Sequence, residues 1–504
     1  MAGYSIHFAT AWGPWAFSDS AAYYSAAQNL LDGQGLVITS ASGIHTPLQH
    51  YPPFYPLLLA ALLRFFPDVF MVARWIDIIS FAVFLFSISW FLYRLTSSVG
   101  FAVVNAFMLL VFPRLLWHFS GMMSEPIFIM AIYSAILSYI LFLQTHQRKF
   151  LFFASFFSLI TALTRYAGLI IIPLITMLSL FYLHKDKWKL LTIFHSITSI
   201  PVGIWFLWVY FNSSSYGARE ILPNNNISSR FNEFWSKAGS EFQAWLPYLH
   251  YRDAIVPPQA KTTLFVVLLL ALVVIFLMQF YKSQQKKVAS AQSMMLLVAL
   301  ILFITLYLVF LLMSYVFTTP QPYIDERMLT PLAPAFFMVL LFIFYQILLL
   351  SPKKIRRGAA VFLSLIFFIT GRYYYLISRE QLKELHTEGY GHTARVFRQS
   401  QFITEIKQLP EQALLFSNNP AFVLLYTNRM PNLLMTLPRA PFVLENTGQV
   451  DDQQDDYPLF LILEFPSLRN IYSDDFEERK DIYLSYLHTV FEEYVGGIYQ
   501  YPSN

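Results

Sequence analysis

Ten apolar runs, each close to the length that crosses a bilayer, constrain this chain more than any other feature. A helix needs about 20 mostly apolar residues to span the hydrocarbon core. The runs lie at residues 74–94, 99–113, 126–143, 150–164, 167–183, 190–210, 263–281, 292–316, 330–350 and 358–376. Only 13% of the 504 residues are charged, against about 25% in soluble domains. We therefore expect a mainly α, polytopic bundle of transmembrane helices, with a shorter interfacial or half-inserted helix at 53–66.

The basic clusters predict the orientation of this bundle. If the spans simply alternate, four clusters fall on one side of the membrane. They are Arg148-Lys149, Lys185/Lys187/Lys189, Lys282/Lys286/Lys287 and Lys353/Lys354/Arg356/Arg357. Short cytoplasmic loops are enriched in lysine and arginine, so this side is predicted to be cytoplasmic. The opposite, extracytoplasmic face then receives residues 1–52, the loops at 114–125, 211–262 and 317–329, and the tail after 377.

Three parts follow from this topology. Residues 1–52 form an external loop, residues 53–376 form the transmembrane domain, and residues 377–504 change character. The tail has strand-like runs at 413–426 and 458–465, a helix-like run at 481–495 and an acidic stretch at 451–456. About 125 residues suffice for a small α/β domain.

The composition also narrows the chemistry. Residues 1–17 lack the basic start and the long apolar core of a cleavable signal peptide. Ten spans place the polar N-terminal segment outside with no span before it, so we expect either a preceding hydrophobic helix or that residues 1–17 are a short membrane-entering stub. The chain has no cysteine, which excludes disulfides, thiolate chemistry and cysteine metal sites. The formal charge of +4 gives no reason to expect a nucleic-acid partner.

Asp19 and Glu125 stand out as carboxylates just outside hydrophobic spans on the predicted external face. An acid at a membrane surface costs free energy unless it is solvated, paired or bound to a cation, so it is a candidate functional group. Each also has a purely structural interpretation. In that interpretation Asp19 serves solely as the cap of the helix that begins near Ala21, and Glu125 serves solely to complement the dipole of the helix that begins before Pro126.

The order of several short elements resembles the GT-C superfamily of polytopic glycosyltransferases. The similar branch contains the protein O-mannosyltransferases of glycosyltransferase family 39 and the aminoarabinose transferases, and the resemblance covers residues 15 to 335. The elements, in order, are Asp19 with Tyr23 and Gly33-Gln34-Gly35, Tyr51-Pro52-Pro53, Ala73-Arg74, Ser124-Glu125-Pro126, Ala162-Leu163-Thr164-Arg165 with Gly168-Leu169, and Glu326-Arg327-Met328-Leu329-Thr330-Pro331. Two positions depart from the pattern: Met328 replaces the usual aromatic residue, and Tyr51 stands where aminoarabinose transferases have lysine.

The resemblance implies an inverting sugar transfer from a polyprenyl-phosphate donor to an acceptor hydroxyl of a protein, lipid or glycan. It implies a bacterial or archaeal plasma (inner) membrane, with the active site facing the extracytoplasmic side. Asp19 is the predicted base, and Glu125 is predicted to orient the acceptor or to hold a divalent metal ion, which we leave open.

The donor phosphate needs fixed cationic partners, for which Arg327 and Arg165 are the candidates. Arg327 could instead pair with Asp325 or Glu326, and Arg165 could cap backbone in a tight turn. The remaining candidates are expected to line the pocket: Tyr23, His50, Tyr51, His118 and Glu326. Arg74 and Asp77, one helical turn apart, are expected to form a structural ion pair.

Two other classes of function fit the composition. A transporter or flippase of lipid-linked saccharides would share the apolar content and the external arginines, but transporters place polar residues at mid-depth and often have symmetric halves. A non-catalytic assembly protein would use its tail to bind a partner.

Overall fold

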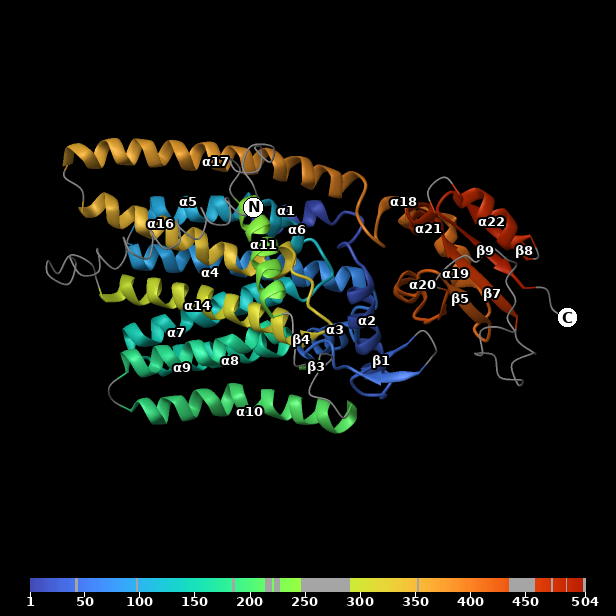
Figure 1. Cartoon of the computed structure of the whole chain (residues 1–504), viewed down its shortest axis with the longest axis horizontal. Coiled ribbons are helices and arrows are strands. Elements are labelled where there is room, and N and C mark those ends of the chain that lie inside the picture. The colour runs from blue at the N-terminus through green and yellow to red at the C-terminus, as the bar shows by residue number, and fades with distance from the viewer. Residues whose placement is uncertain are drawn as a thin grey trace.

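A bundle of long helices lies at one end of the molecule and a mixed α/β domain at the other (Figure 1). The computed structural model describes residues 1–40, 44–96, 98–183, 186–213, 220–221, 227–245, 291–350, 353–434, 458–472, 475–485 and 487–501. The bundle helices are α4 (Val69–Thr96), α5 (Val99–Leu110), α7 (Glu125–Thr145), α8 (Arg148–Thr164), α9 (Ile171–Tyr182), α10 (Lys187–Ser213), α14 (Ala291–Phe317), α16 (Ala333–Leu350) and α17 (Lys353–Thr387). Each apolar run predicted within the described residues is helical over most of its length. The run at 263–281, the cluster at 282–287 and the acidic stretch at 451–456 lie outside the described residues.

Six helices of the described part are long and apolar enough to cross a membrane. They are Val69–Arg94, Glu125–Thr145, Lys187–Ser213, Met295–Phe317, Glu326–Tyr345 and Arg356–Thr387. Three shorter apolar helices accompany them: Phe54–Leu63, Val99–Leu110 and Tyr166–Tyr182. The chain is therefore an integral membrane protein with the mainly α architecture that its hydropathy predicts.

Helix α7 is the centre of the bundle. It packs against α4 and α8, and 89% of its most apolar stretch is buried. A helix that is apolar on all faces belongs in the interior, which is where α7 lies. The Tyr133 hydroxyl donates a hydrogen bond to the Pro331 carbonyl (2.8 Å) and accepts one from the Ala335 amide (2.8 Å). These bonds hold the start of α16 against α7 and so place residues 326–329 near the end of α7 that carries Glu125.

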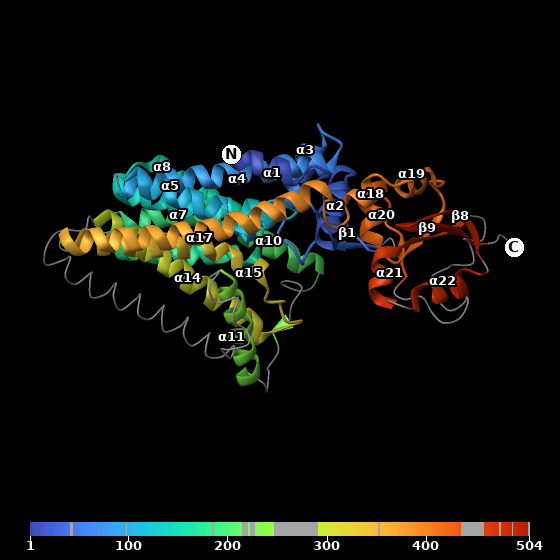
Figure 2. The same cartoon turned by 90° about the horizontal axis from the view of Figure 1, so that it is seen from above.

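Short elements cover the end of the bundle that adjoins the α/β domain (Figures 1 and 2). They are α1 (Ala2–Ala9), α2 (Ser18–Leu31), the antiparallel pair β1 (Val37–Thr39) and β2 (His45–Pro47), α3 (Phe54–Leu63), α6 (Pro113–His118), η1 (Tyr166–Ile170), α11 (Ile227–Ala244), β3 (Glu220–Ile221) with β4 (Thr318–Thr319), α15 (Glu326–Leu329) and η2 (Thr330–Leu332). The basic starts of α8, α10 and α17 lie at the opposite end (Figure 1). The elements predicted to be external thus share one end of the bundle.

The C-terminal domain is built on a five-stranded mixed sheet with the order β6-β5-β7-β9-β8. Its elements are α18 (Arg395–Arg398), α19 (Gln401–Gln408), β5 (Leu414–Ser417), α20 (Pro420–Thr427), β6 (Asn432–Leu433), β7 (Leu459–Glu464), α21 (Phe465–Tyr472), α22 (Phe476–Leu484), β8 (His488–Glu493) and β9 (Gly496–Gln500). Strands β6, β5 and β7 are parallel, whereas β9 is antiparallel to β7 and β8. Alternate residues of β7 enter different hydrophobic clusters, one with α19 and α20 and the other with α21 and α22. This is the predicted small α/β domain.

The secondary structure expected for the tail was wrong in two places. The strand-like run at 413–426 forms β5 and then α20, because Asn419 caps a helix that starts at Pro420. The helix-like run at 481–495 is helical only to Leu484 and then forms β8, whose Thr489, Val490 and Phe491 are β-branched and aromatic. Helix α20 also packs against α2, so the tail supports the helix that carries Asp19.

Candidate active site at one end of the bundle

Asp19 lies in the first turn of α2 and faces two partners. One carboxylate oxygen accepts a hydrogen bond from the Tyr51 hydroxyl (2.6 Å), and the other lies 2.6 Å from an Nη of Arg327. The side chain is 24% exposed. The Ser20 hydroxyl, and not the Asp19 carboxylate, accepts from the Phe17 amide at the start of α2. The interpretation of Asp19 as merely a helix cap is therefore wrong.

Glu125 is the first residue of α7 and its carboxylate is buried, with 1% of the side chain exposed. One of its oxygens lies 2.5 Å from an Nη of Arg165 and also accepts from the Nε of Arg327. Ser124 is the N-cap residue and Pro126 follows, so the helix dipole adds to the favourable environment of this anion. Two guanidinium groups converge on one carboxylate, which satisfies it in the interior.

Arg165 is placed by a sharp break between α8 and η1. Its backbone is extended, and a side chain on Gly168 would come within 2.2 Å of the Thr161 carbonyl, so the turn requires glycine. The guanidinium also donates to the Ser124 hydroxyl (3.3 Å). Among the described residues, the Arg165 guanidinium donates to no backbone carbonyl, so the alternative capping role is not seen. Burial alone would lower the pKa of Arg165, but the Glu125 carboxylate raises it above its ordinary value.

Arg327 bridges the two carboxylates: its Nη contacts Asp19 and its Nε contacts Glu125. Arg327 does not pair with Asp325 or Glu326, the two acids beside it in the sequence. Asp325 instead accepts from the Met328 amide (3.1 Å) and caps α15, while Glu326 pairs with Arg114. Arg327 is therefore directed into the cluster formed by Asp19, Glu125, Arg165 and Arg327, which we call the four-residue cluster.

Tyrosines line one side of the four-residue cluster. The Tyr23 ring packs edge-on against Tyr51 (centroids 4.7 Å apart) and Tyr55 (5.0 Å). The Tyr23 hydroxyl hydrogen-bonds the Ser124 hydroxyl (3.0 Å). Burial, with the nearby carboxylates, raises the pKa of both Tyr23 and Tyr51 far above the ordinary value, so both remain neutral donors.

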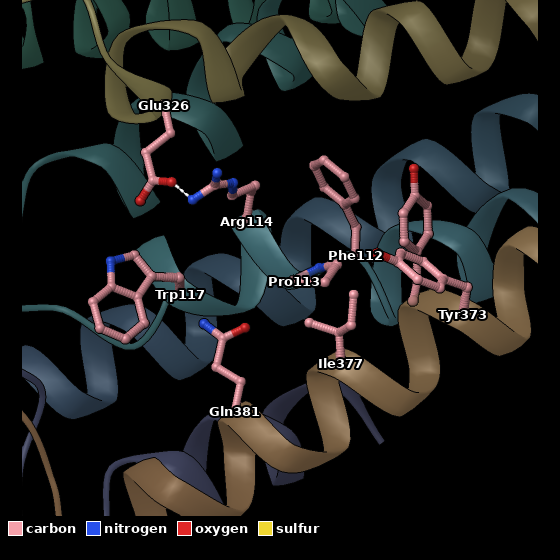
Figure 3. Close-up of a pocket in the computed structure, with 9 residues that line it drawn as sticks. Phe112, Pro113, Arg114, Trp117, Glu326, Tyr373, Ile377 and Gln381 are labelled. Carbon is pink, nitrogen blue, oxygen red and sulfur yellow. Dashed lines mark ion pairs between the residues drawn. The ribbon is translucent and has the colours of Figure 1, made fainter. Parts of the chain in front are cut away.

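The three other candidates occupy different places. His118 is buried, and burial lowers its pKa to about 3 although the Glu125 charge opposes this, so it is neutral at pH 7. Its Nε2 has no hydrogen-bond partner among the described residues. His50 is exposed, with its ring tilted against Tyr51. The Glu326 carboxylate forms an ion pair with Arg114 and not with a residue of the four-residue cluster (Figure 3).

The residues around Glu125 do not suit a divalent cation. Two guanidinium groups already contact its carboxylate and would repel a further cation. Within the described ranges, no group of three or more histidine or acidic side chains is arranged to hold a metal. We therefore derive no step through a metal ion at this position.

The sequence did not single out the Ser124 hydroxyl, which hydrogen-bonds Tyr23, Glu125 and Arg165, although Ser124 is adjacent to Glu125. Sequence reasoning also missed Arg114, a cation at the start of the segment 114–125 that ends at Glu125. The ion pair expected between Arg74 and Asp77 is wrong. Arg74 donates to the His7 carbonyl (2.7 Å), and neither carboxylate oxygen of Asp77 is hydrogen-bonded to a described residue.

Solved structures share this fold. The structure of ArnT from Cupriavidus metallidurans bound to undecaprenyl phosphate matches with a TM-score of 0.56 and 10% identity, covering 99% of this chain and 96% of that one. The archaeal oligosaccharyltransferase AglB from Archaeoglobus fulgidus, in complex with an inhibitory peptide and a dolichol-phosphate, matches with a TM-score of 0.50 and 11% identity, covering 96% and 72%. No protein-family model matches the sequence, and no curated protein does so significantly.

The two structural neighbours are GT-C glycosyltransferases. The chain therefore has the GT-C fold that its sequence motifs resemble.

Proposed function

We propose that this protein is an inverting glycosyltransferase that moves a sugar from a polyprenyl-phosphate donor to an acceptor hydroxyl. The observation that carries the proposal is the four-residue cluster, in which two acids and two arginines from four separate elements meet at one end of a membrane bundle. The neighbours bound to undecaprenyl phosphate and to dolichol-phosphate support this donor class. The basic clusters at the other end support an extracytoplasmic site.

Arg165 and Arg327 are assigned to the donor phosphate. The bond between the anomeric carbon and the phosphate oxygen breaks with its electron pair, so negative charge grows on the leaving phosphate. Guanidinium groups that already point to one place stabilise that charge without reorganising. The two arginines are held by Glu125, which we assign as the residue that positions them.

Asp19 is assigned as the base. As the acceptor oxygen attacks the anomeric carbon, its proton passes to a carboxylate oxygen of Asp19. Tyr51 donates to Asp19 from one side and Arg327 contacts it from the other, so the carboxylate is fixed beside the arginine assigned to the phosphate. Because Tyr51 replaces a lysine of the aminoarabinose transferases, the donor site here has one cation fewer at that position.

The test is transfer by purified Asp19→Asn protein. A polyprenyl-phosphate hexose with a labelled sugar is incubated with the protein and a membrane extract that supplies acceptors. Asp19→Asn should abolish transfer and keep its expression and membrane insertion. Asp32→Asn, an exposed position at the end of the same helix, is the matched control and should transfer normally. Full transfer by Asp19→Asn would exclude Asp19 as the base.

A flippase of lipid-linked saccharides is the alternative. Asp77, buried within α4, is the kind of intramembrane acid that a transporter uses. Movement of labelled donor across a vesicle membrane without any transfer to an acceptor would favour this alternative.

A further inference from the structure

A cavity lies beside the four-residue cluster, between α6, α15 and α17. Its volume is about 370 Å³, large enough for a single sugar ring with its substituents, and it is partly open to the surroundings. Figure 3 shows Arg114 and Trp117 from α6, Glu326 from α15, and Gln381 from α17 around it. None of these side chains has a role in the transfer proposed above.

The cationic wall of this cavity is already neutralised. Arg114 forms an ion pair with Glu326 and lies 3.8 Å from a carboxylate oxygen of Glu241. A phosphate entering here would meet these carboxylates as well as the guanidinium, and their repulsion opposes its binding. The cavity therefore holds one guanidinium group beside two carboxylates, whereas the four-residue cluster matches two guanidinium groups with two carboxylates.

The remaining wall combines aromatic faces with neutral polar groups. Trp117 is held by Trp15 (centroids 5.6 Å apart) and Tyr390 (4.7 Å), and Tyr373 lines the cavity from α17. The Gln381 amide is directed into the space and makes no hydrogen bond within the described part of the chain (Figure 3). Rigid aromatic surface with a few fixed donors and acceptors suits an uncharged, polyhydroxylated ring.

Helix α17 connects this cavity to the lipid phase. Only 12% of the most apolar stretch of α17 is buried, and Leu365, Phe368 and Leu376 on this helix are 53%, 68% and 43% exposed. Figures 1 and 2 show α17 along an edge of the bundle. Ile377 lines the cavity and is itself 40% exposed, so the apolar face runs into the cavity wall. A lipid chain lying on α17 would bring its head group into the cavity.

The cavity and the four-residue cluster are adjacent, because residues that line the cavity are neighbours in the sequence of residues in or beside the cluster. Glu326 and Arg327 are consecutive, and the first faces the cavity while the second contacts Asp19 and Glu125. One turn of α6 likewise separates Arg114, which lines the cavity, from the buried His118. A molecule held in the cavity therefore lies next to the residues assigned to sugar transfer.

We propose that this cavity binds the uncharged saccharide head group of a membrane glycolipid whose chains lie along α17, and that this glycolipid is the acceptor. The acceptor role rests on the proposed function, whereas the binding does not. Gln381 is then a residue that sets acceptor specificity. Its amide hydrogen-bonds the head group, and Trp117 packs against the ring.

The experiment is photo-crosslinking of a glucosyl diacylglycerol that carries a diazirine next to its head group, using the full-length protein in nanodiscs. Labelled residues are identified by mass spectrometry. Labelling should concentrate on the cavity walls, and unlabelled glucosyl diacylglycerol should compete. Gln381→Leu should weaken binding about fivefold, the effect of one lost hydrogen bond. Lys383→Leu, exposed on the same helix, is the matched control and should bind as the wild type does.

The outcomes separate the two proposals. Asp19→Asn should lose transfer and still be labelled as the wild type is. Equal competition by phosphatidylglycerol with the same chains, or full competition by free glucose, would overturn the glycolipid proposal. Unchanged binding by Gln381→Leu would do so too. Transfer that survives in Asp19→Asn, together with normal labelling of the cavity, would instead contradict the assigned catalytic base and leave the binding site standing.

Discussion

Replacing Arg327 with lysine keeps the charge and removes the geometry on which the proposed site depends. Arg327 uses two different nitrogens, an Nη toward Asp19 and the Nε toward Glu125. The single ammonium group of a lysine is a point charge and does not reproduce a planar fork. A lysine at position 327 would therefore contact Asp19 or Glu125, and not both.

The size of the effect follows from the contact that is lost. A hydrogen bond to a charged group contributes about 1.5–3 kcal/mol. If that contact holds the donor phosphate and the base in register during the reaction, its loss lowers kcat/KM roughly 10- to 150-fold. The charge is conserved, so the protein should still insert and fold.

The assay is steady-state transfer from a labelled polyprenyl-phosphate hexose, with donor and acceptor concentrations varied separately. Arg327→Lys should impair use of the donor more than use of the acceptor. Arg398→Lys is the control, because Arg398 donates to the Trp12 carbonyl (2.9 Å) away from the cluster, and it should change kcat/KM less than about threefold. Equal loss on both substrates, or no loss, would refute the assignment of Arg327 to the phosphate.

Three further results are expected. Tyr51→Phe removes the hydrogen bond to Asp19 and should slow kcat about tenfold, the effect of one charge-assisted hydrogen bond, without changing thermal stability; a wild-type rate would contradict this. Glu125→Gln leaves two guanidinium groups without their shared carboxylate and should lower the free energy of unfolding by about 3 kcal/mol or more, seen as a lower Tm in detergent; an unchanged Tm would count against the geometry. Burial lowers the pKa of His118 to about 3, so the folded protein loses stability as the pH falls from about 6.5 toward 3. This loss is about 2 kcal/mol at pH 5, and His118→Asn should reduce it; equal acid sensitivity of the two proteins would exclude it.

The sequence was informative where physical rules act locally. Hydropathy located the spans because every lipid-facing helix must be apolar for about 20 residues. The same rule made Asp19 and Glu125 conspicuous, because acids are expensive at those positions. The basic clusters predicted which segments share one end, and the structure places them there.

What the sequence could not predict depends on contacts between distant segments. The Tyr51 hydroxyl meets Asp19 only because α2 packs on α3, and Arg114 meets Glu326 across more than 200 positions. The misassigned strand β8 has the same explanation. Residues 481–495 contain a pattern compatible with a helix, but pairing with β9 makes the second half a strand. Arg74 is taken up by the His7 carbonyl of α1 and so does not pair with Asp77.

The most direct measurement is a cryo-electron microscopy structure of the protein in nanodiscs with a polyprenyl phosphate. We predict density for the phosphate within hydrogen-bonding distance, about 3 Å, of the guanidinium groups of Arg165 and Arg327, with Asp19 on the side from which an acceptor approaches. A phosphate bound at the opposite end of the bundle, or in the cavity lined by Arg114 and Gln381, would contradict the assignment of the four-residue cluster as the site of sugar transfer.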